Sequence, residues 1–362
     1  MKVAIVHYWV LQMRGGEKVL EALCEMYPNA DIYTHVYDPN NVSATIRSHN
    51  VFTTFISRLP FAKKLYKLYL PFMPLALELL DLTEYDLIIS SESGPAKGII
   101  PGPRATHICY CHSPMRYIWD HYHVYYKSAG FISRLLMPVI SHYLRQWDMA
   151  SAARTDVFVA NSSHVANRIK KYYRRDAVVI HPPVAVEDFS KVDKSELGDF
   201  YLWAGELVAY KRPDILVEAF NQSGKKLVVI GDGPALKKLQ QVAKGNIQFL
   251  GKVDFNTLKW HFSRCKALIF PGEEDFGIIP VEVLASGRPV IGLAKGGLLD
   301  IFDGQQVGQL FHDASISSLQ HSIDLFEQDS GKFEDICIER SKKFNKEIFV
   351  SEFFEVVKKA TS

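Results

Sequence analysis

Short apolar runs alternate with segments of helical periodicity along the first half of the chain. The runs that predict strands are residues 3–9, 31–37, 86–91, 106–111, 156–162 and 177–183. Residues 19–27 and 163–173 instead repeat apolar side chains at the spacing of one helix face. This alternation predicts a parallel sheet that helices cover on both faces.

The same rhythm begins again after a polar stretch, residues 184–198, which we interpret as a linker. The second set of predicted strands is 199–207, 226–233, 247–253, 266–272 and 288–294, and the helices between them are 213–222, 234–243 and 256–265. The sequence therefore predicts two doubly wound, Rossmann-like α/β domains, residues 1–183 and 199–345. The amphipathic segment 346–360 is expected to form a helix that is free to complete the first domain.

Composition and charge argue against a membrane-spanning or nucleic-acid-binding protein but do not indicate a function. The chain has 362 residues, a net charge of +2 and no apolar run of the roughly 20 residues that span a bilayer. This charge gives no reason to expect nucleic acid as a partner. The five cysteines indicate reduced, buried thiols in a cytoplasmic protein. Cys109, Cys111 and nearby histidines lack a C-x-x-C pair, so packing is favoured over a metal site.

The segment 271–290 carries the most informative chemistry in the chain. Glu274 and Glu282 are seven residues apart and flank a loop that leads into Pro280. Proline at a first helical position predicts that a helix begins at Pro280, and Gly287 predicts its end. By themselves the two carboxylates would also fit a solvated surface pair, so their surroundings decide the interpretation.

The loop before this helix predicts an anion site. The amides of Gly277, Ile278 and Ile279 are expected to lie at the helix N-terminus, where backbone N–H groups bind phosphate. Carboxylates on both sides of that site suit a ligand with hydroxyl groups at its two ends. A sugar nucleotide, with a hexose, a diphosphate and a ribose, has this arrangement.

Polar residues and glycines follow several of the predicted strands. Gly15 and Gly16 follow the first strand, residues 91–94 the third, His112 the fourth, and Glu274 the fourth strand of the second domain. Ligands of open parallel sheets bind beyond the carboxyl ends of the strands. We therefore expect two domains that face each other across a cleft lined by these residues.

Several longer motifs resemble a known family. They are the frame E-x-F-G-x-x-x-x-E-x-x-A-x-G-x-P-V at 274–290, A-G-E-L-V-A-Y-K-R-P-D at 204–214, G-D-G-P at 231–234 and the run 296–311. Together they resemble the retaining glycosyltransferases of family 4, which have the GT-B fold. C-H-S-P-M-R-Y-I-W-D at 111–120 and H-P-P-V at 181–184 look most like mannosyltransferases of bacterial O-antigen and exopolysaccharide assembly.

The resemblance implies roles for residues of the second domain. Glu274 would hold hexose hydroxyls and stabilise developing positive charge, and Glu282 would accept hydrogen bonds from the ribose. The amides at the helix start would bind the sugar and the diphosphate. Lys211 would neutralise the diphosphate. Lys252 and Val253 would line the base.

The resemblance also implies roles for the first domain and exposes one departure. Gly16, with Gly15, would approach the diphosphate, and His112 would touch a sugar hydroxyl. Many relatives have a phosphate-binding arginine where this chain has Glu206. Arg212 is the obvious substitute, although it need not face the same way as its neighbour Lys211. No metal is expected, because a D-x-D motif near a strand end is missing from the sequence.

The resulting hypothesis is a hexosyltransferase that moves mannose from GDP-mannose, with retention, onto a lipid-linked oligosaccharide. The basic and apolar segments 55–80 and 131–147 favour a cytoplasmic protein bound peripherally to the inner face of the membrane. The alternatives are a transferase that uses a UDP-sugar or another GDP-hexose, and a sugar-nucleotide epimerase. A dinucleotide-binding oxidoreductase or a non-catalytic interaction module is disfavoured, because the first strand leads into R-G-G-E and not G-x-G-x-x-G.

Overall fold

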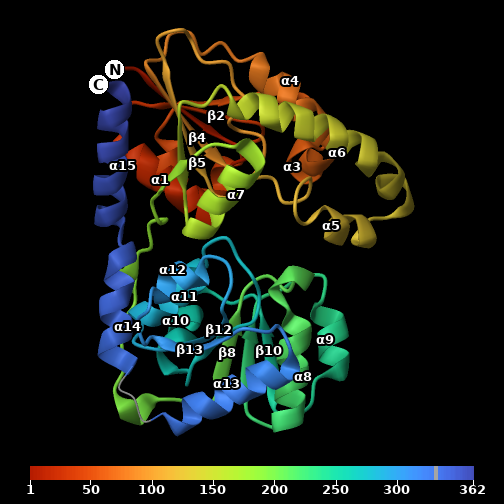
Figure 1. Ribbon diagram of the computed structural model, residues 1–362, viewed down its shortest axis with the longest axis vertical. Helices are drawn as coiled ribbons and strands as arrows, with labels where there is room; N and C mark the ends of the chain where they lie inside the picture. Colours follow the sequence, from red (N-terminus) through yellow and green to blue (C-terminus); the bar gives the residue numbers. More distant parts are fainter. Residues whose placement is uncertain (330–332) are drawn as a thin grey trace. The chain divides into compact units, whose positions relative to one another are not determined.

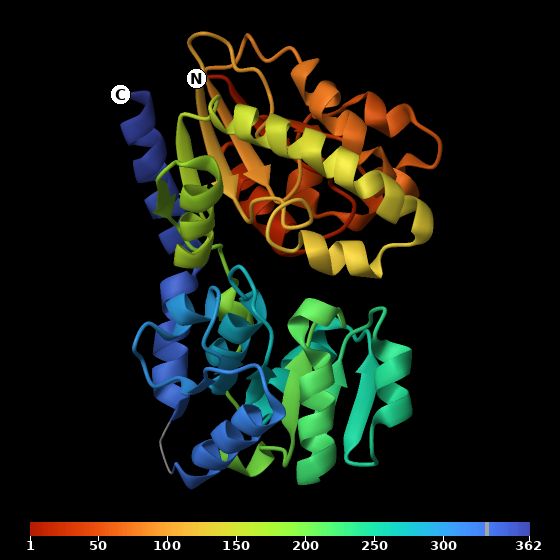
Figure 2. The same ribbon diagram turned by 45° about the vertical axis from the view of Figure 1, so that its right-hand side comes forward.

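The computed structural model describes residues 1–329 and 333–362 and divides the chain into two compact units. The first unit contains Met1–Pro183 and Phe349–Ser362, and the second contains Val184–Ile348. Each unit has one twisted sheet with helices on both of its faces (Figures 1 and 2). The prediction of two doubly wound α/β domains is confirmed.

The first unit is built on a seven-stranded parallel sheet with the order β3-β2-β1-β4-β5-β6-β7. Its strands are β1 (Val3–His7), β2 (Asp31–Thr34), β3 (Val51–Thr53), β4 (Leu87–Glu92), β5 (Thr106–Cys111), β6 (Val157–Ala160) and β7 (Ala177–Val179). All six predicted strands are present. β3 was not predicted because this short edge strand has two exposed side chains and no apolar run.

Eight α-helices contribute described residues to the first unit. They are α1 (Gly15–Met26), α2 (Ala44–Arg47), α3 (Ala62–Leu65), α4 (Met73–Glu78), α5 (Tyr122–Ser128), α6 (Phe131–Ala152), α7 (Ser163–Tyr173) and α15 (Lys346–Thr361). Phe349, Phe353 and Val357 of α15 are buried in the same hydrophobic cluster as Ile5 and Tyr110 of the sheet. The end of the chain therefore contributes to the core that its beginning forms.

The second unit is built on a six-stranded parallel sheet with the order β10-β9-β8-β11-β12-β13. Its strands are β8 (Tyr201–Ala204), β9 (Leu227–Ile230), β10 (Ile247–Gly251), β11 (Leu268–Phe270), β12 (Val290–Leu293) and β13 (Gly308–Phe311). Its helices are α8 (Pro213–Ser223), α9 (Leu236–Val242), α10 (Phe255–Arg264), α11 (Ile278–Ala285), α12 (Leu298–Phe302), α13 (Ile316–Gln328) and α14 (Phe333–Ser341). β13 was not predicted as a strand.

The stretch interpreted as a linker, residues 184–198, belongs to the second unit. Phe189 is buried there and stacks on Phe262 of α10. The Val184 amide donates a hydrogen bond to the Phe344 carbonyl at 2.9 Å. The buried side chains of Val184 and Phe189 thus anchor a segment that its polar composition had indicated was a linker.

Both sheets contain a topological switch point. It is the place in the strand order where the chain, after adding strands toward one edge of the sheet, begins to add strands toward the other edge. In the first sheet this point lies between β1 and β4, and in the second between β8 and β11. At such a point the loops that follow the two strands diverge to opposite faces of the sheet and leave room for a ligand. Candidate site residues that follow β1, β4, β8 or β11 therefore lie beside one of these two points.

Candidate functional site

The switch point of the second unit brings two predicted residues together. Lys211 follows β8 and Glu274 follows β11, and these strands are neighbours in the sheet although 63 residues separate the two side chains. The Lys211 Nζ atom lies 2.9 Å from Glu274 Oε1, and both side chains are mostly buried. A cation and a carboxylate thus meet where a doubly wound domain binds its ligand.

Neighbouring carboxylates keep Lys211 positively charged. Burial lowers the pKa of the ammonium group, but the carboxylates of Glu274 and, more weakly, Glu206 outweigh it and raise the pKa above its ordinary value. Lys211 is therefore protonated at neutral pH. Glu206 is itself exposed, at the position where relatives are expected to have arginine.

Two glycines let the Lys211 loop pack closely against its neighbours. A Cβ atom at Gly272 would lie 2.5 Å from the Lys211 Cα atom, and one at Gly205 would lie 3.2 Å from Lys211 Nζ. A distance of 2.5 Å to backbone is too short for any side chain. Gly272 is therefore required for the approach of the β8 loop to the β11 loop.

A second glycine pair, after β12, supports the Glu274 loop from the other side. The Gly297 amide donates to the Glu274 carbonyl at 2.9 Å, and Cβ atoms at Gly296 and Gly297 would lie 2.2 and 2.4 Å from carbonyl oxygens of that loop. In the sequence these glycines are recognised only as part of the family motif at 296–311. A Gly-Gly pair three residues after the end of a buried strand was the signal for their supporting role.

Helix α11 begins earlier than predicted. Its first residue is Ile278, and Gly277 precedes it with φ 98°, a left-handed conformation that favours glycine. Pro280 is the third helical residue, where its missing N–H still costs no helical hydrogen bond. The amides of Gly277, Ile278 and Ile279 therefore have no acceptor within the helix, as an anion site requires.

The earlier start changes the position of the second carboxylate. Glu282 was predicted in the first turn, but it is the fifth residue of α11 and lies in the second turn, half-buried. The error came from placing the helix start at the proline, which tolerates any position in the first turn.

Arg212 has a different partner from Lys211. It adopts a left-handed conformation, φ 53°, immediately before α8. Its guanidinium binds Asp214, with Nε 3.0 Å from Oδ1 and Nη2 2.9 Å from Oδ2. The structure thus does not bring Arg212 to Glu274, where Lys211 lies.

The two residues predicted to line the base lie farther along the same sheet edge. Lys252 and Val253 follow β10, the edge strand, which β9 and β8 separate from β11. Val253 packs against the hydrophobic core.

In the first unit, the glycine pair lies in a helix and not in a loop. Helix α1 begins at Gly15, so Gly15 and Gly16 are its first two residues. A Cβ atom at Gly16 would lie 2.3 Å from the Tyr8 hydroxyl oxygen. Gly16 is therefore required by a contact inside its own domain, in addition to any role at a ligand.

His112 lies beside the switch point of the first sheet. Its Nε2 atom is 2.8 Å from Ser91 Oγ, and Ser91 Oγ is 3.0 Å from Nδ1 of His7. The ring of Tyr110 contacts the His112 ring edge-on, with centroids 5.1 Å apart. Contacts with Ser91 and Tyr110 thus fix the position of the His112 ring.

A buried ion cluster below this edge was not predicted from the sequence. The ammonium of Lys97 binds Glu92 Oε1 at 2.9 Å and also Asp148, and all three side chains are fully buried. Burial lowers the pKa of Lys97, but Asp148 and Glu92 outweigh it and raise the pKa. The Glu92 carbonyl accepts a hydrogen bond from the His112 amide at 2.7 Å. The cluster therefore supports the backbone that carries His112.

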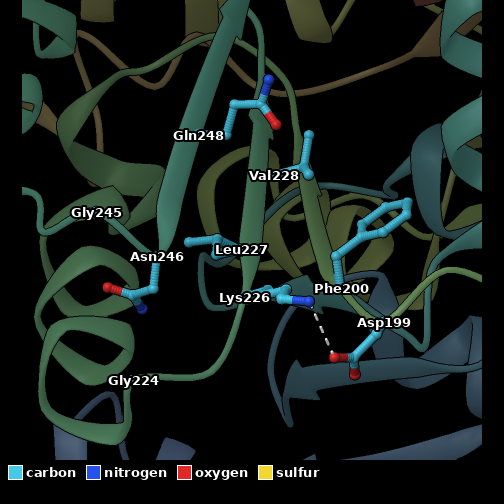
Figure 3. Close-up of a pocket in the computed structure, with 9 residues that line it drawn as sticks. All are labelled: Asp199, Phe200, Gly224, Lys226, Leu227, Val228, Gly245, Asn246 and Gln248. Carbon is cyan, nitrogen blue, oxygen red and sulfur yellow. Dashed lines mark ion pairs between the residues drawn. The ribbon is translucent and has the colours of Figure 1, made fainter.

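A shallow hollow lies at the opposite edge of the second sheet (Figure 3). It is lined by Asp199, Phe200, Gly224, Lys226, Leu227, Val228, Gly245, Asn246 and Gln248. Asp199, Lys226 and Asn246 precede β8, β9 and β10, so the hollow lies at the amino ends of the strands. Lys226 is paired there with Asp199 at 3.3 Å (Figure 3). Because parallel sheets bind ligands at the carboxyl ends, no site is assigned to this hollow.

Two protein-family models match the chain and together cover most of it. "Glycosyltransferase Family 4" matches residues 13–188, and "Glycosyl transferases group 1" matches residues 184–344.

Two curated relatives match about half of the chain. One is an uncharacterized glycosyltransferase, MJ1178, of Methanocaldococcus jannaschii, which is 28% identical over 48% of this chain and 50% of its own length. The other is the O-antigen chain mannosyltransferase RfbU of Salmonella typhimurium, which is 30% identical over 46% of this chain and 48% of its own. The chain thus spans about half the length of the curated relatives that it matches.

The fold is shared with solved structures along nearly its whole length. The structure of Anabaena Alr3699/HepE in complex with UDP and glucose matches with a TM-score of 0.70, 16% identity and 99% coverage of both chains. This likeness shows the fold, which is GT-B. With both family models matched in order along the chain, the protein belongs to the family 4 glycosyltransferases.

Proposed function

We propose that the protein transfers a hexosyl group from a nucleotide-sugar donor, with retention, and that the donor binds at the β8–β11 switch point. The observation that carries the proposal is the Lys211–Glu274 pair beside the N-terminus of α11. The three amides there and the Lys211 ammonium offer positive charge to a diphosphate. The Glu274 carboxylate offers acceptors to hexose hydroxyls.

In this mechanism the charge of the leaving diphosphate is stabilised by Lys211 and the helix N-terminus, with no metal required. Glu274 stabilises the positive charge that develops on the sugar, and the departing phosphate takes the proton of the acceptor hydroxyl. Glu282 is proposed to bind the ribose, and Lys252 and Val253 to line the base. Arg212 would have to leave Asp214 before it could bind phosphate.

Two variants and one control test the site. Lys211→Met and Glu274→Gln are each expected to lower kcat/KM by about 10²- to 10³-fold, because each removes an interaction with charge that develops in the reaction. Lys226→Met, which removes a lysine at the opposite edge of the same sheet, should leave kcat/KM unchanged. Thermal melts of all three should stay close to that of the native protein. Unaltered turnover in Glu274→Gln would refute the site.

For the donor we propose GDP-mannose, supported by the mannosyltransferase RfbU among the relatives. The alternatives are UDP-sugars, other GDP-hexoses and epimerisation. Consumption of a panel of GDP- and UDP-sugars, with product analysis by NMR, separates them. Consumption of UDP-glucose alone would exclude the mannose proposal, and conversion of the donor without transfer would indicate an epimerase.

For the acceptor we propose a lipid-linked oligosaccharide, reached at the inner membrane surface. Within the described residues, no helix has the length and apolarity to cross a bilayer. Helix α6 nevertheless exposes several large apolar side chains, with Phe131 at 85% and Val139 at 73% exposure. Residues 39–77 contain five Lys or Arg and residues 121–147 contain three, and neither range contains Asp or Glu.

These two ranges are adjacent in the first unit. Leu77 of α4 and Leu144 and Trp147 of α6 share one hydrophobic cluster, and both views place α4 beside α6 (Figures 1 and 2). Lys63 is paired with Asp38, but the other cations lie among apolar side chains in ranges that contain no carboxylate, and this combination matches the chemistry of an anionic lipid surface.

Flotation with vesicles tests this surface. The native protein should float with vesicles that contain phosphatidylglycerol and much less with phosphatidylcholine alone. The double variant Leu135→Glu/Val139→Glu should not float, whereas Val242→Glu, at an exposed position of α9, should float like the native protein. Equal binding by the double variant and the native protein would overturn the surface assignment.

A further inference from the structure

Three polar side chains form a continuous hydrogen-bonded chain across three neighbouring strands of the first sheet. His7 is the last residue of β1, Ser91 lies opposite it in β4, and His112 follows β5 directly. Ser91 Oγ lies 3.0 Å from His7 Nδ1 and 2.8 Å from His112 Nε2. His7 and Ser91 are almost completely buried.

A serine hydroxyl has a single proton, so the chain has two possible directions. In the first, His7 Nδ1–H donates to Ser91 Oγ, and the Ser91 hydroxyl donates to His112 Nε2. In the second, His112 Nε2–H donates to Ser91 Oγ, and the Ser91 hydroxyl donates to His7 Nδ1. The direction therefore decides which nitrogen of His112 holds its proton.

The other ring nitrogen of His7 distinguishes the two directions. Burial, and then the proximity of His112, lower the pKa of His7 well below its ordinary value, so the ring is neutral and has one N–H. His7 Nε2 is buried and has no hydrogen-bond partner among the described residues. The second direction would place the N–H at this position, as a buried donor without an acceptor. Such donors are rarer in proteins than unfilled acceptors.

We propose that His7 and Ser91 are positioning residues that fix the tautomer of His112, with Nε2 as acceptor and the proton on Nδ1. His112 then offers an N–H donor from Nδ1 to its ligand and does not act as a base through Nε2. The family resemblance implies that this ligand is a sugar hydroxyl, and that part of the proposal rests on the proposed function. The tautomer is inferred from the two hydrogen bonds of Ser91 and from the unfilled Nε2 atom of His7.

The tautomer is measured on the unliganded protein by ring ¹⁵N chemical shifts after labelling with ¹⁵N-histidine. The His112 signals are those lost in His112→Gln. We expect a protonated Nδ1 and an unprotonated Nε2 in the native protein. Ser91→Ala should shift His112 toward the Nε2–H tautomer. A native His112 with its proton on Nε2, or a spectrum that Ser91→Ala leaves unchanged, would overturn the inference whatever the enzyme transfers.

A matched control lies one residue away in the same strand. Ser90 Oγ bonds Nε2 of buried His107 at 2.9 Å, so Ser90→Ala removes the same kind of contact on the opposite face of β4. It should leave the His112 tautomer and kcat unchanged. His7→Asn keeps an N–H donor in the place of Nδ1 and should preserve the His112 tautomer. His7→Leu removes that donor and should lose the tautomer.

The kinetic consequence is a separate readout. Ser91→Ala should lower kcat about tenfold, the lower end of the loss found when the hydrogen-bond partner that orients a metal-ligating histidine is removed. If native His112 has the expected tautomer but Ser91→Ala keeps full kcat, the positioning of His112 by Ser91 has no role in catalysis, and that part of the proposal is overturned. This outcome would leave the donor site at Lys211 and Glu274 unaffected.

Discussion

Glu17 should make the stability of the first domain fall as the pH rises from about 4.5 to about 7. Its side chain is almost completely buried in the first turn of α1, where Oε2 accepts a hydrogen bond from the Arg14 amide at 3.1 Å. Burial raises the pKa of this carboxyl from 4.5 to about 7, against weaker opposing effects of the backbone hydrogen bonds and Arg14. The folded state therefore binds this proton more tightly than the unfolded state does.

The sign and size of the effect follow from linkage. Below about pH 4.5 the carboxyl is protonated in both states and has no effect. Between pH 4.5 and 7 the unfolded chain loses its proton first, so the free energy of unfolding decreases as the pH rises. Above pH 7 the cost of the buried carboxylate is complete, at about 3 kcal/mol.

Glu17→Gln removes this cost and keeps an oxygen that accepts from the Arg14 amide. Urea unfolding should show the variant more stable than the native protein at pH 8, and the advantage should be about 2 kcal/mol smaller at pH 5. The difference between the two proteins is the quantity to compare, because burial lowers the pKa of His35 and His107 to about 4 and makes both proteins less stable in acid. Glu25→Gln, at an exposed position of α1, should change stability by less than about 0.5 kcal/mol at either pH. An advantage of Glu17→Gln that is the same at both pH values would refute the reasoning.

Three further substitutions test the cores and the donor loop. Lys97→Met leaves two buried carboxylates unpaired and should cost about 3–5 kcal/mol by urea unfolding at pH 8, with a smaller loss at pH 5; an equal loss at both would contradict the ion cluster. Phe353→Ala in the core face of α15 should cost about 3–5 kcal/mol, whereas Phe354→Ala, at an exposed position, should cost less than 1. Gly297→Ala should lower donor affinity, measured by calorimetry, because its Cβ would displace the Glu274 loop, whereas Gly245→Ala, which meets no atom within 4 Å, should not.

The fold was predictable because the strands of buried parallel sheets are continuous apolar runs. β1 and β9 show this, since all but the last residue of β1 and all of β9 are apolar and every side chain in both strands is buried. The edge strands β3 and β13 lack that signal, because their side chains are mostly half-buried or exposed. The start of α11 was also misplaced. Proline is tolerated throughout the first turn of a helix, so Pro280 alone does not show whether it is the first or the third helical residue.

Sequence motifs select the candidate site residues one by one, but they do not give the arrangement of those residues. Motif positions selected Lys211 and Glu274, yet their 2.9 Å contact depends on β8 lying next to β11, a long-range pairing with no local signal. The same motif reasoning offered Arg212 as a second phosphate ligand but left open whether it faces the same way as Lys211. The left-handed backbone at Arg212 turns its side chain to Asp214 instead.

Gly16 shows why a motif glycine is weak support for a ligand contact. The family resemblance assigns it to the approach of a diphosphate, but a Cβ atom there would first lie 2.3 Å from the Tyr8 hydroxyl oxygen. Loss of activity in Gly16→Ala alone would therefore not distinguish a blocked donor from a displaced tyrosine. In a Tyr8→Phe background the nearest ring atom would lie 3.3 Å away, a distance that a small shift relieves. If Gly16 contacts the donor, Gly16→Ala should still raise the KM for the donor in that background, and an unchanged KM would show that Tyr8 alone requires the glycine.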